Sequence, residues 1–314
     1  MKRELNKLSA VVPAYNEQEV LPMFCERITA VLEPLGCDYE IILVDDGSRD
    51  DTWKVILEEC SKDSHIRGLR FARNFGHQLA VTAGMDAASG DALVVIDADL
   101  QDPPEVIVEM VEKWKEGFDV VYGKRKKREG ETLFKKLTAF MYYRLLKSMS
   151  GTAIPLDTGD FRLLDKRVAD VMGKMREHNR FLRGLSAWTG FSQCPVEYVR
   201  HERAAGKTKY TLKKMFKLAA DGIIGYSSKP LTMAFFIGGG AIGLTLASMV
   251  ALLVVQLING FSLLPWLLAL LFLLCGTTLA FMGVIGAYVA RIYDEAKNRP
   301  LYIISEHAGT ELQP

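Results

Sequence analysis

The sequence lacks charge over one long stretch. Residues 230–290 contain no Asp, Glu, Lys or Arg, so all 39 basic and 38 acidic side chains lie in the rest of the 314 residues. The net charge of +1 gives no strong positive field, and nucleic acid is not an expected partner. The mean hydropathy of +0.09 therefore averages a soluble part and a membrane segment. This excludes both a wholly soluble protein and a bundle that lies mainly in lipid.

Cysteine and histidine are also scarce. The five cysteines are scattered, and one of them, Cys275, lies in the apolar stretch, which predicts reduced thiols and no disulfide framework or zinc site. The five histidines are too dispersed to indicate a metal cluster, and the sequence has neither a G-x-x-x-x-G-K-[ST] phosphate loop nor H-E-x-x-H. No apolar signal-peptide core precedes Pro13, so we expect the soluble part to stay in the cytoplasm.

The charge-free stretch predicts two transmembrane helices. Residues 231–258 and 263–290 are apolar runs of 28 residues each, and at 1.5 Å per residue either can cross a hydrocarbon core of about 30 Å. The four residues between them predict an antiparallel hairpin. Lys229 precedes the first run and Arg291 follows the second, so both outer ends are expected in the cytoplasm.

Residues 238–243 match G-x-G-x-x-G, the dinucleotide fingerprint. That fingerprint requires a preceding strand and a soluble helix, whereas these glycines lie in a charge-free helix. They indicate close helix packing, which also permits self-association. No ionisable residue lies at membrane depth, so a transport function has no support.

The part before residue 126 alternates short β-rich runs with amphipathic helical runs. This alternation predicts a mostly parallel sheet with helices on both faces. Ligands bind beyond the carboxyl ends of the strands in such sheets. The predicted strands are residues 8–12, 39–44, 66–71, 92–96 and 120–122, and a further strand is expected at 161–164.

Three of these strands end in dense polar sequence, at residues 13–17, 45–48 and 97–102. Acidic residues at strand ends also form turns and cap helices, and for residues 45–51 alone this interpretation stays open. Asp97 and Asp99 flank a single residue directly after a buried strand. Their carboxylates suit Mg²⁺ or Mn²⁺, with phosphates completing the coordination shell.

These three segments resemble family 2 glycosyltransferases of the GT-A fold. Residues 73–76, 99–105 and 159–162, together with the two apolar runs, narrow the resemblance to polyprenyl-phosphate glycosyltransferases. The sequence is similar to dolichol-phosphate mannose synthases and more closely to bacterial bactoprenol glucosyltransferases, from about residue 8 to 304. The resemblance implies a GT-A nucleotide-sugar-binding α/β fold, amphipathic interface helices and a C-terminal two-helix transmembrane hairpin.

The resemblance also implies the reaction. A membrane-bound enzyme would transfer one hexose, with inversion, from a nucleoside-diphosphate sugar to polyprenyl (undecaprenyl) phosphate, and the product would serve cell-envelope glycan modification. UDP-glucose is the favoured donor, and Mg²⁺ or Mn²⁺ the expected cofactor. The sequence lacks the Gln-x-x-Arg-Trp signature of processive synthases, which favours a single transfer. The donor sugar, the chain length of the lipid and the oligomeric state stay open.

Individual residues receive roles from the resemblance. Asp160 would orient the acceptor or act as base, with Asp157 as runner-up, although either aspartate could instead cap a turn. The nucleotide-sugar residues would be Pro13, Tyr15, Glu17, Asp46, Asp97 and Asp99. The metal ligands would be Asp97, Asp99 and Gln101. The phosphate- and acceptor-binding residues would be Arg125, Arg162, Arg203 and Lys209, with Arg125 also counted as catalytic and Arg162 supporting the site from behind.

These observations divide the chain into four parts. We expect a cytoplasmic catalytic domain at 1–210, an interfacial amphipathic helix at 211–229, the transmembrane hairpin at 230–290 and a cytoplasmic tail at 291–314, in the cell (inner) membrane. Residues 133–149 form a second amphipathic stretch, which suits the interface or an ordinary core-facing helix. The alternative function is a non-catalytic, membrane-tethered nucleotide-sugar binding or scaffold protein. Asp97, Asp99 and Asp160 together favour catalysis.

Overall fold

The described part of the chain is dominated by one mixed β-sheet. The computed structural model describes residues 3–126, 158–200 and 264–309, with isolated positions between 236 and 254. The chain divides into two compact units. The first, here called the sheet unit, comprises residues 1–143, 152–211 and 300–314, and the second, the apolar unit, comprises residues 144–151 and 212–299.

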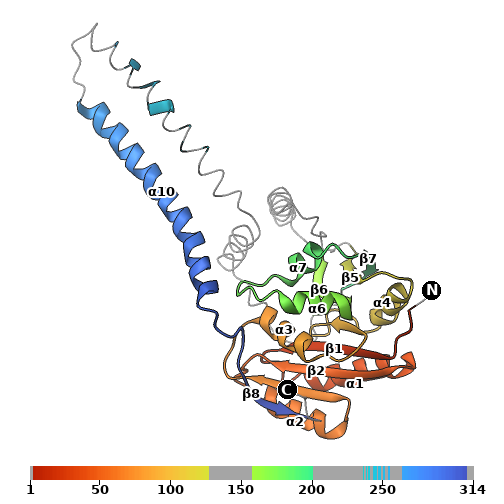
Figure 1. The fold of residues 1–314 in the computed structure, drawn as a ribbon. Coiled ribbons are helices and arrows are strands. Elements are labelled where there is room, and N and C mark those ends of the chain that lie inside the picture. The colour runs from red at the N-terminus through yellow and green to blue at the C-terminus, as the bar shows by residue number, and fades with distance from the viewer. Residues whose placement is uncertain are drawn as a thin grey trace. The chain divides into compact units, whose positions relative to one another are not determined.

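The sheet has eight strands in the order β7-β5-β6-β4-β1-β2-β3-β8 (Figure 1). The strands are β1 (Lys7–Ala14), β2 (Asp38–Asp45), β3 (Ile66–Phe71), β4 (Ala92–Val95), β5 (Val120–Arg125), β6 (Thr158–Asp165), β7 (Gln193–Tyr198) and β8 (Ile304–Ala308). Pairs β1–β2, β1–β4, β2–β3 and β5–β7 are parallel, whereas β4–β6, β5–β6 and β3–β8 are antiparallel. The predicted α/β class and mostly parallel sheet are confirmed, with antiparallel strands added.

Helices cover both faces of this sheet because its strands are apolar on both sides. The helices among the described residues of the sheet unit are α1 (Leu21–Leu32), α2 (Thr52–Lys62), α3 (His77–Ala87), α4 (Val106–Lys115), α6 (Lys166–Lys174) and α7 (Leu182–Trp188), with a 3-10 turn η1 (Glu33–Leu35). Side chains of α1, α2 and α4 share one hydrophobic cluster with Leu8, Ala10 and Val12. Val11 instead faces Gly84 of α3, where an added Cβ would lie 2.3 Å from the valine. Successive side chains of β1 thus point to opposite faces of the sheet and pack against helices on both faces.

The sheet opens at the carboxyl ends of β1 and β4. β1 pairs with β2 as far as Ala14, but its pairing with β4 ends at Val11 and Val95. Pro13, which has no N–H to donate, lies beyond that last β4 pair. The chain continues from β1 to β2 on one side while β4 lies on the other, which makes this the topological switch point where α/β sheets bind ligands.

The apolar unit contains helix α10 (Leu264–Ala296). Within it, Trp266–Ala296 has a mean hydropathy of 2.4 and is not buried, and it is the one described helix long and apolar enough to cross a membrane. The first predicted transmembrane run, 231–258, falls mostly outside the described residues. A two-helix hairpin is therefore not shown.

Strand β8 follows α10 and belongs to the sheet unit, a feature that the sequence analysis did not predict. Glu306 of β8 accepts a hydrogen bond from Trp53 Nε1 at 2.9 Å and forms an ion pair with Arg70 at 2.5 Å. Nearby, Tyr302 stacks on Phe71 and donates to Asp86 at 2.7 Å. The residues after the apolar unit thus protect the edge of β3.

We expect deletion of residues 300–314 to lower the thermal stability of the protein and to promote aggregation, because β3 would become an unpaired edge strand. Deletion of residues 310–314 keeps β8 and is the matched control. Thermal unfolding and light scattering of the two variants in detergent check this expectation. Equal melting temperatures would show that β8 contributes nothing to stability.

Candidate functional site

Hydrogen bonds join the loop after β1 to the segment after β2, beyond the carboxyl ends of these strands. Asn16 N donates to Ser48 Oγ at 2.9 Å, and Glu17 N donates to Thr52 Oγ1 at the same distance. Asn16 has φ +55°, a left-handed conformation that asparagine tolerates better than most residues. Pro13 is buried, whereas Tyr15 and Glu17 are half-buried at the edge predicted for them.

The acidic residues after β2 have two different roles. Asp45 Oδ1 accepts from Ser48 N at 2.9 Å, which is the turn-forming role left open for this segment. Asp46, only 3 % exposed, instead accepts from the backbone N–H groups of Phe75 at 2.7 Å and Gly76 at 3.0 Å. Burial raises the pKa of Asp46, and these hydrogen bonds oppose the rise. Asp46 therefore holds the loop that leads into α3.

Gly47 allows the loops after β2 and β3 to touch. Its φ is +65°, and an added Cβ would lie 2.4 Å from the carbonyl carbon of Arg73 and 2.6 Å from the nitrogen of Asn74. Because these are backbone atoms, no side-chain movement could relieve the clash. A residue other than glycine would separate the two loops.

Asp97 and Asp99 lie where β4 ends. Leu100, with φ +56°, turns the chain so that Gln101 N donates to Asp99 Oδ1 at 3.1 Å. The Asp97 side chain is 33 % exposed. Its pKa is raised by burial and by the negative charges of Asp160, Asp99 and Asp102, while His77 opposes the rise. Burial and nearby negative charges thus disfavour the ionised form of Asp97, a cost that a cation would relieve.

Asp160, on β6, is held by three donors. Arg183 Nε donates to Oδ1 at 2.9 Å and Gln78 Nε2 donates to Oδ2 at 3.0 Å, while His77 Nε2 lies 3.2 Å from Oδ2. Burial alone would raise the pKa of this carboxyl, but His77 and Arg183 hold it well below its usual range. Asp160 is therefore a fixed, ionised carboxylate.

His77 links Asp160 to the end of β4. It is the first residue of α3, and its Nε2 lies 3.7 Å from Asp97 Oδ1 as well as 3.2 Å from Asp160 Oδ2. Burial lowers the pKa of His77, but the hydrogen bond to Asp160 and the charge of Asp97 outweigh this and raise it to about 9. The imidazole is therefore cationic at neutral pH. His77 thus joins Asp97 and Asp160, both predicted from the sequence as site residues, in one cluster.

Arg125 lies beside Gly159 at the end of β5. Its Nε donates to Tyr198 Oη at 3.3 Å, and the tyrosine donates to the buried Asp102 at 2.5 Å. An added Cβ at Gly159 would lie 2.7 Å from Arg125 Nη2. Because Gly159 has no side chain, the Arg125 guanidinium can lie against its backbone, next to Asp160 in the sequence.

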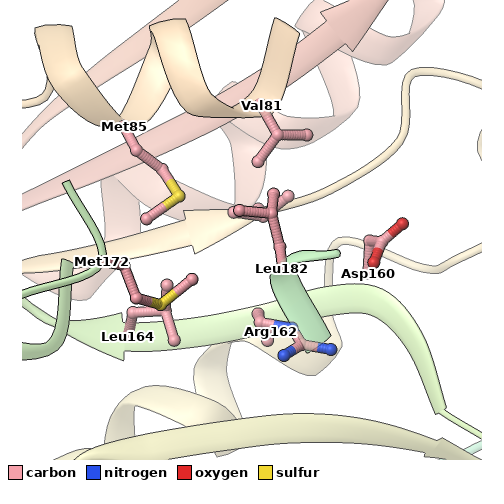
Figure 2. A pocket seen from close by; sticks show the side chains of 8 residues that line it. Val81, Met85, Asp160, Arg162, Leu164, Met172 and Leu182 are labelled. Carbon is pink, nitrogen blue, oxygen red and sulfur yellow. The ribbon is translucent and has the colours of Figure 1, made fainter. Parts of the chain in front are cut away.

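Arg162 is buried, and it lines a small pocket together with Asp160 and apolar side chains (Figure 2). Its Nη1 donates to Ser186 Oγ and its Nη2 donates to the carbonyl of Gly159 at 3.0 Å. Burial lowers the pKa of Arg162 to about 10, and the charge of Asp160 opposes the fall. Arg162 thus contacts the backbone one residue before Asp160, and its supporting role stays a prediction.

Comparison with known proteins identifies the family. The model of glycosyl transferase family 2 matches residues 9–173. The chain belongs to glycosyl transferase family 2. It is 50 % identical to the glycosyltransferase YkcC of Bacillus subtilis (strain 168) over 96 % of this chain and 94 % of that protein. It is 39 % identical to the SfII prophage-derived bactoprenol glucosyl transferase of Shigella flexneri over 96 % and 99 %.

Among solved structures, a glucosyl-3-phosphoglycerate synthase from Mycobacterium tuberculosis matches with a TM-score of 0.46 and 18 % identity, covering 70 % of this chain and 78 % of that one. The family assignment and the observed mixed sheet agree with the expected GT-A-like fold. The chain is thus a glycosyltransferase.

The donor set of this glycosyltransferase fits a divalent metal ion. The two carboxylates at the end of β4 are the oxygen ligands that Mg²⁺ and Mn²⁺ prefer, and burial together with nearby negative charge raises the pKa of Asp97. Within residues 3–126, 158–200 and 264–309, no group of three or more His, Cys, Asp or Glu side chains forms a fuller site. An ion held by only two carboxylates would keep coordination positions open for substrate phosphates, as is usual for magnesium.

Three of the predicted site residues cannot be placed, and three residues of the cluster were not predicted. Asp157, Arg203 and Lys209 lie outside the described residues. Residues that the sequence analysis missed are His77, Gln78 and Arg183. His77 and Gln78 follow the loop after β3, so the rule that ligands bind beyond strand ends could have found them. Arg183 lies on a short helix and gave no such signal.

We expect Gly159→Ala to reduce glycosyl transfer by about 10- to 100-fold, because small misplacements of a site group have costs of this size. The new Cβ would meet the flexible end of Arg125 rather than backbone, so the fold should persist. Gly173→Ala, where the nearest atom would be 3.6 Å away, is the control. Initial rates and melting temperatures check this, and equal rates for both variants would contradict it.

Proposed function

We propose that this glycosyltransferase transfers one hexose, with inversion, from a nucleoside-diphosphate sugar to polyprenyl (undecaprenyl) phosphate, and that UDP-glucose is the donor. The observation that carries the proposal is the clustering of Asp97, His77 and Asp160 at the switch point of the sheet. The 39 % identity to a bactoprenol glucosyl transferase over nearly the whole chain supports the choice of substrates. The product would serve cell-envelope glycan modification.

The donor would bind beyond the carboxyl ends of β1, β2 and β4. Pro13, Tyr15 and Glu17 lie in the loop after β1, next to the loop that Asp46 holds, and would contact the nucleoside. Asp97 and Asp99, with Gln101 as a third candidate, would hold Mg²⁺ or Mn²⁺. When bound, that ion would neutralise negative charge on the departing nucleoside diphosphate.

The acceptor would approach Asp160. A polyprenyl phosphate is already anionic near neutral pH, so its attack on the anomeric carbon needs little help from a base. The low pKa of Asp160 suits orientation of the acceptor better than proton removal. Arg125, beside Gly159, would attract the phosphate, and Arg203 and Lys209 would contribute further cationic contacts, with Asp157 as an alternative acceptor-side acid.

The purified full-length protein tests the reaction. We expect UDP release from UDP-glucose when both a divalent ion and a short polyprenyl phosphate are present, and no release after EDTA treatment. A panel of other nucleotide sugars tests the donor, and NMR of the product tests inversion. Nucleotide binding without release would favour the non-catalytic alternative, and turnover without the lipid would contradict the acceptor.

The position of β8 supports a membrane hairpin. Residues 152–211 and 300–314 belong to one folded unit, so they lie on the same side of any membrane. A chain that crosses the bilayer at α10 must therefore cross it an even number of times. Residues 231–258 are long and apolar enough for the other crossing. The flanking Lys229 and Arg291 favour a cytoplasmic sheet unit and cytoplasmic termini.

Single-cysteine labelling tests this topology. In a cysteine-free background, we expect Ser262→Cys to react with an impermeant maleimide in spheroplasts, because the turn would face outward. Asn298→Cys should react only after the membrane is permeabilised. Reaction of both positions in intact spheroplasts would place the two ends of α10 on the same side of the membrane and would contradict the hairpin.

A further inference from the structure

Gln78 connects α7 to the carboxylate of Asp160. Its Nε2 donates to Asp160 Oδ2 at 3.0 Å, and its Oε1 accepts from Leu182 N, at the start of α7, at 2.9 Å. A carboxylate can only accept and a backbone N–H can only donate, so one orientation of the amide satisfies both partners. A shorter side chain, or the Gln78 amide with its oxygen and nitrogen exchanged, could not make both hydrogen bonds.

The next residue of α7 completes the connection. Arg183 Nε donates to Asp160 Oδ1 at 2.9 Å, and Nη1 donates to the carbonyl of Thr158 at 2.9 Å. Each oxygen of Asp160 therefore has a donor from a different helix, Gln78 from α3 and Arg183 from α7. The Asp160 side chain is 9 % exposed, so these bonds are shielded from competing water.

Geometry of this kind fixes a carboxylate rather than merely stabilising it. An ionised carboxylate offers about four lone-pair directions. Among the described residues, Gln78, Arg183 and His77 approach it along three of them, which leaves about one direction that these three do not use. Rotation of the carboxylate would break at least one charge-assisted bond.

We propose that Gln78 and Arg183 are positioning residues that aim the remaining lone-pair direction of Asp160 at the P–O–H group of the monoanionic acceptor phosphate, and so determine how efficiently the sugar is transferred rather than lost to water. This inference rests on the proposed function, in which Asp160 faces the acceptor. In the reaction, the phosphate oxygen forms a bond to the anomeric carbon as the bond to the nucleoside diphosphate breaks. A poorly aimed acceptor would leave that carbon open to water, which would give free sugar and the same nucleotide.

The test compares Gln78→Met with Gln193→Met in the full-length protein. Gln193 also bonds α7, since its Nε2 donates to the carbonyl of Ser186 at 3.3 Å, but it does not contact Asp160. We expect Gln78→Met to lower kcat for transfer by about 10- to 100-fold, the usual loss when a supporting partner of a site residue is removed. The donor KM should change little, and the ratio of donor hydrolysis to transfer should rise. Gln193→Met should keep wild-type values.

Two further variants keep the test decisive if Gln78→Met does not fold. Gln78→Glu places a second carboxylate against Asp160, and Arg183→Lys keeps the charge but loses the paired N–H groups; both should raise the hydrolysis ratio. An unchanged kcat and ratio in the variants that fold would overturn the inference. Absence of lipid-dependent transfer by the wild-type protein would instead overturn the proposed function, so the two failures are distinguishable.

Discussion

Asp97→Asn and Asp99→Asn are each expected to reduce lipid-dependent transfer by about 10³-fold, because a metal ion contributes several kcal/mol of charge stabilisation and each ~1.4 kcal/mol is a factor of ten. An amide is a weaker metal ligand than a carboxylate. Removal of the metal by EDTA should have the same effect on the wild-type protein, and added Mn²⁺ or Mg²⁺ should restore it. Initial rates of UDP release measure each effect.

Stability should not fall in Asp97→Asn. The pKa of Asp97 is raised, so the ionised form is disfavoured in the folded protein and carries an energetic cost at neutral pH. The neutral amide removes that cost, and we expect a melting temperature equal to or above that of the wild type. Asp170→Asn, which loses only an exposed ion pair with Lys166, is the control. Wild-type activity in Asp97→Asn would show that this carboxylate does not hold an essential metal.

The positions of Asp97 and Asp99 could be predicted from the sequence because strand order alone brings them to the ligand-binding edge. Each parallel strand there is a short apolar run, and the residue that follows it must lie beyond the sheet. Only the chain order β1, β2, β3, β4 and the rule for right-handed crossovers are needed. No long-range contact enters the inference.

The partners of Asp160 could not be predicted in the same way. Gln78 and Arg183 lie 82 and 23 residues from it in sequence, and neither follows a pattern that indicates which side chain it meets. The motif around residues 159–162 indicated an acceptor-side acid. It gave no information on the donors that fix its orientation, because these depend on how α3 and α7 pack on the sheet.

Strand β8 was missed for a different physical reason. Its residues are mostly polar, so it lacks the apolar run that marks the other strands. Its stability comes from contacts far along the chain, such as the ion pair between Arg70 and Glu306, which are 236 residues apart. A short edge strand of this kind resembles a loop in sequence.

Asp160→Asn should also abolish most transfer, but, unlike Asp97→Asn, it should destabilise the fold. The amide of this variant would turn an N–H₂ group toward Arg183, Gln78 or His77, all of which are donors. The pKa of Asp160 is well below its usual range, so its ionised form stabilises the folded protein at neutral pH, and this stabilisation is lost only in acid, as pH falls through the folded pKa.

The expected loss of stability in Asp160→Asn is on the order of 2 kcal/mol, less than the roughly 3–5 kcal/mol of a fully buried pair, because Arg183 is 28 % exposed. For a unit of this size that corresponds to about 4–8 °C in melting temperature. Buried Arg162 would also lose the negative charge that opposes the fall of its pKa. Thermal unfolding of Asp160→Asn beside Asp97→Asn measures the contrast. If both variants were equally stable, Asp160 would not be the anion that balances these arginines, and its fixed orientation would need another cause.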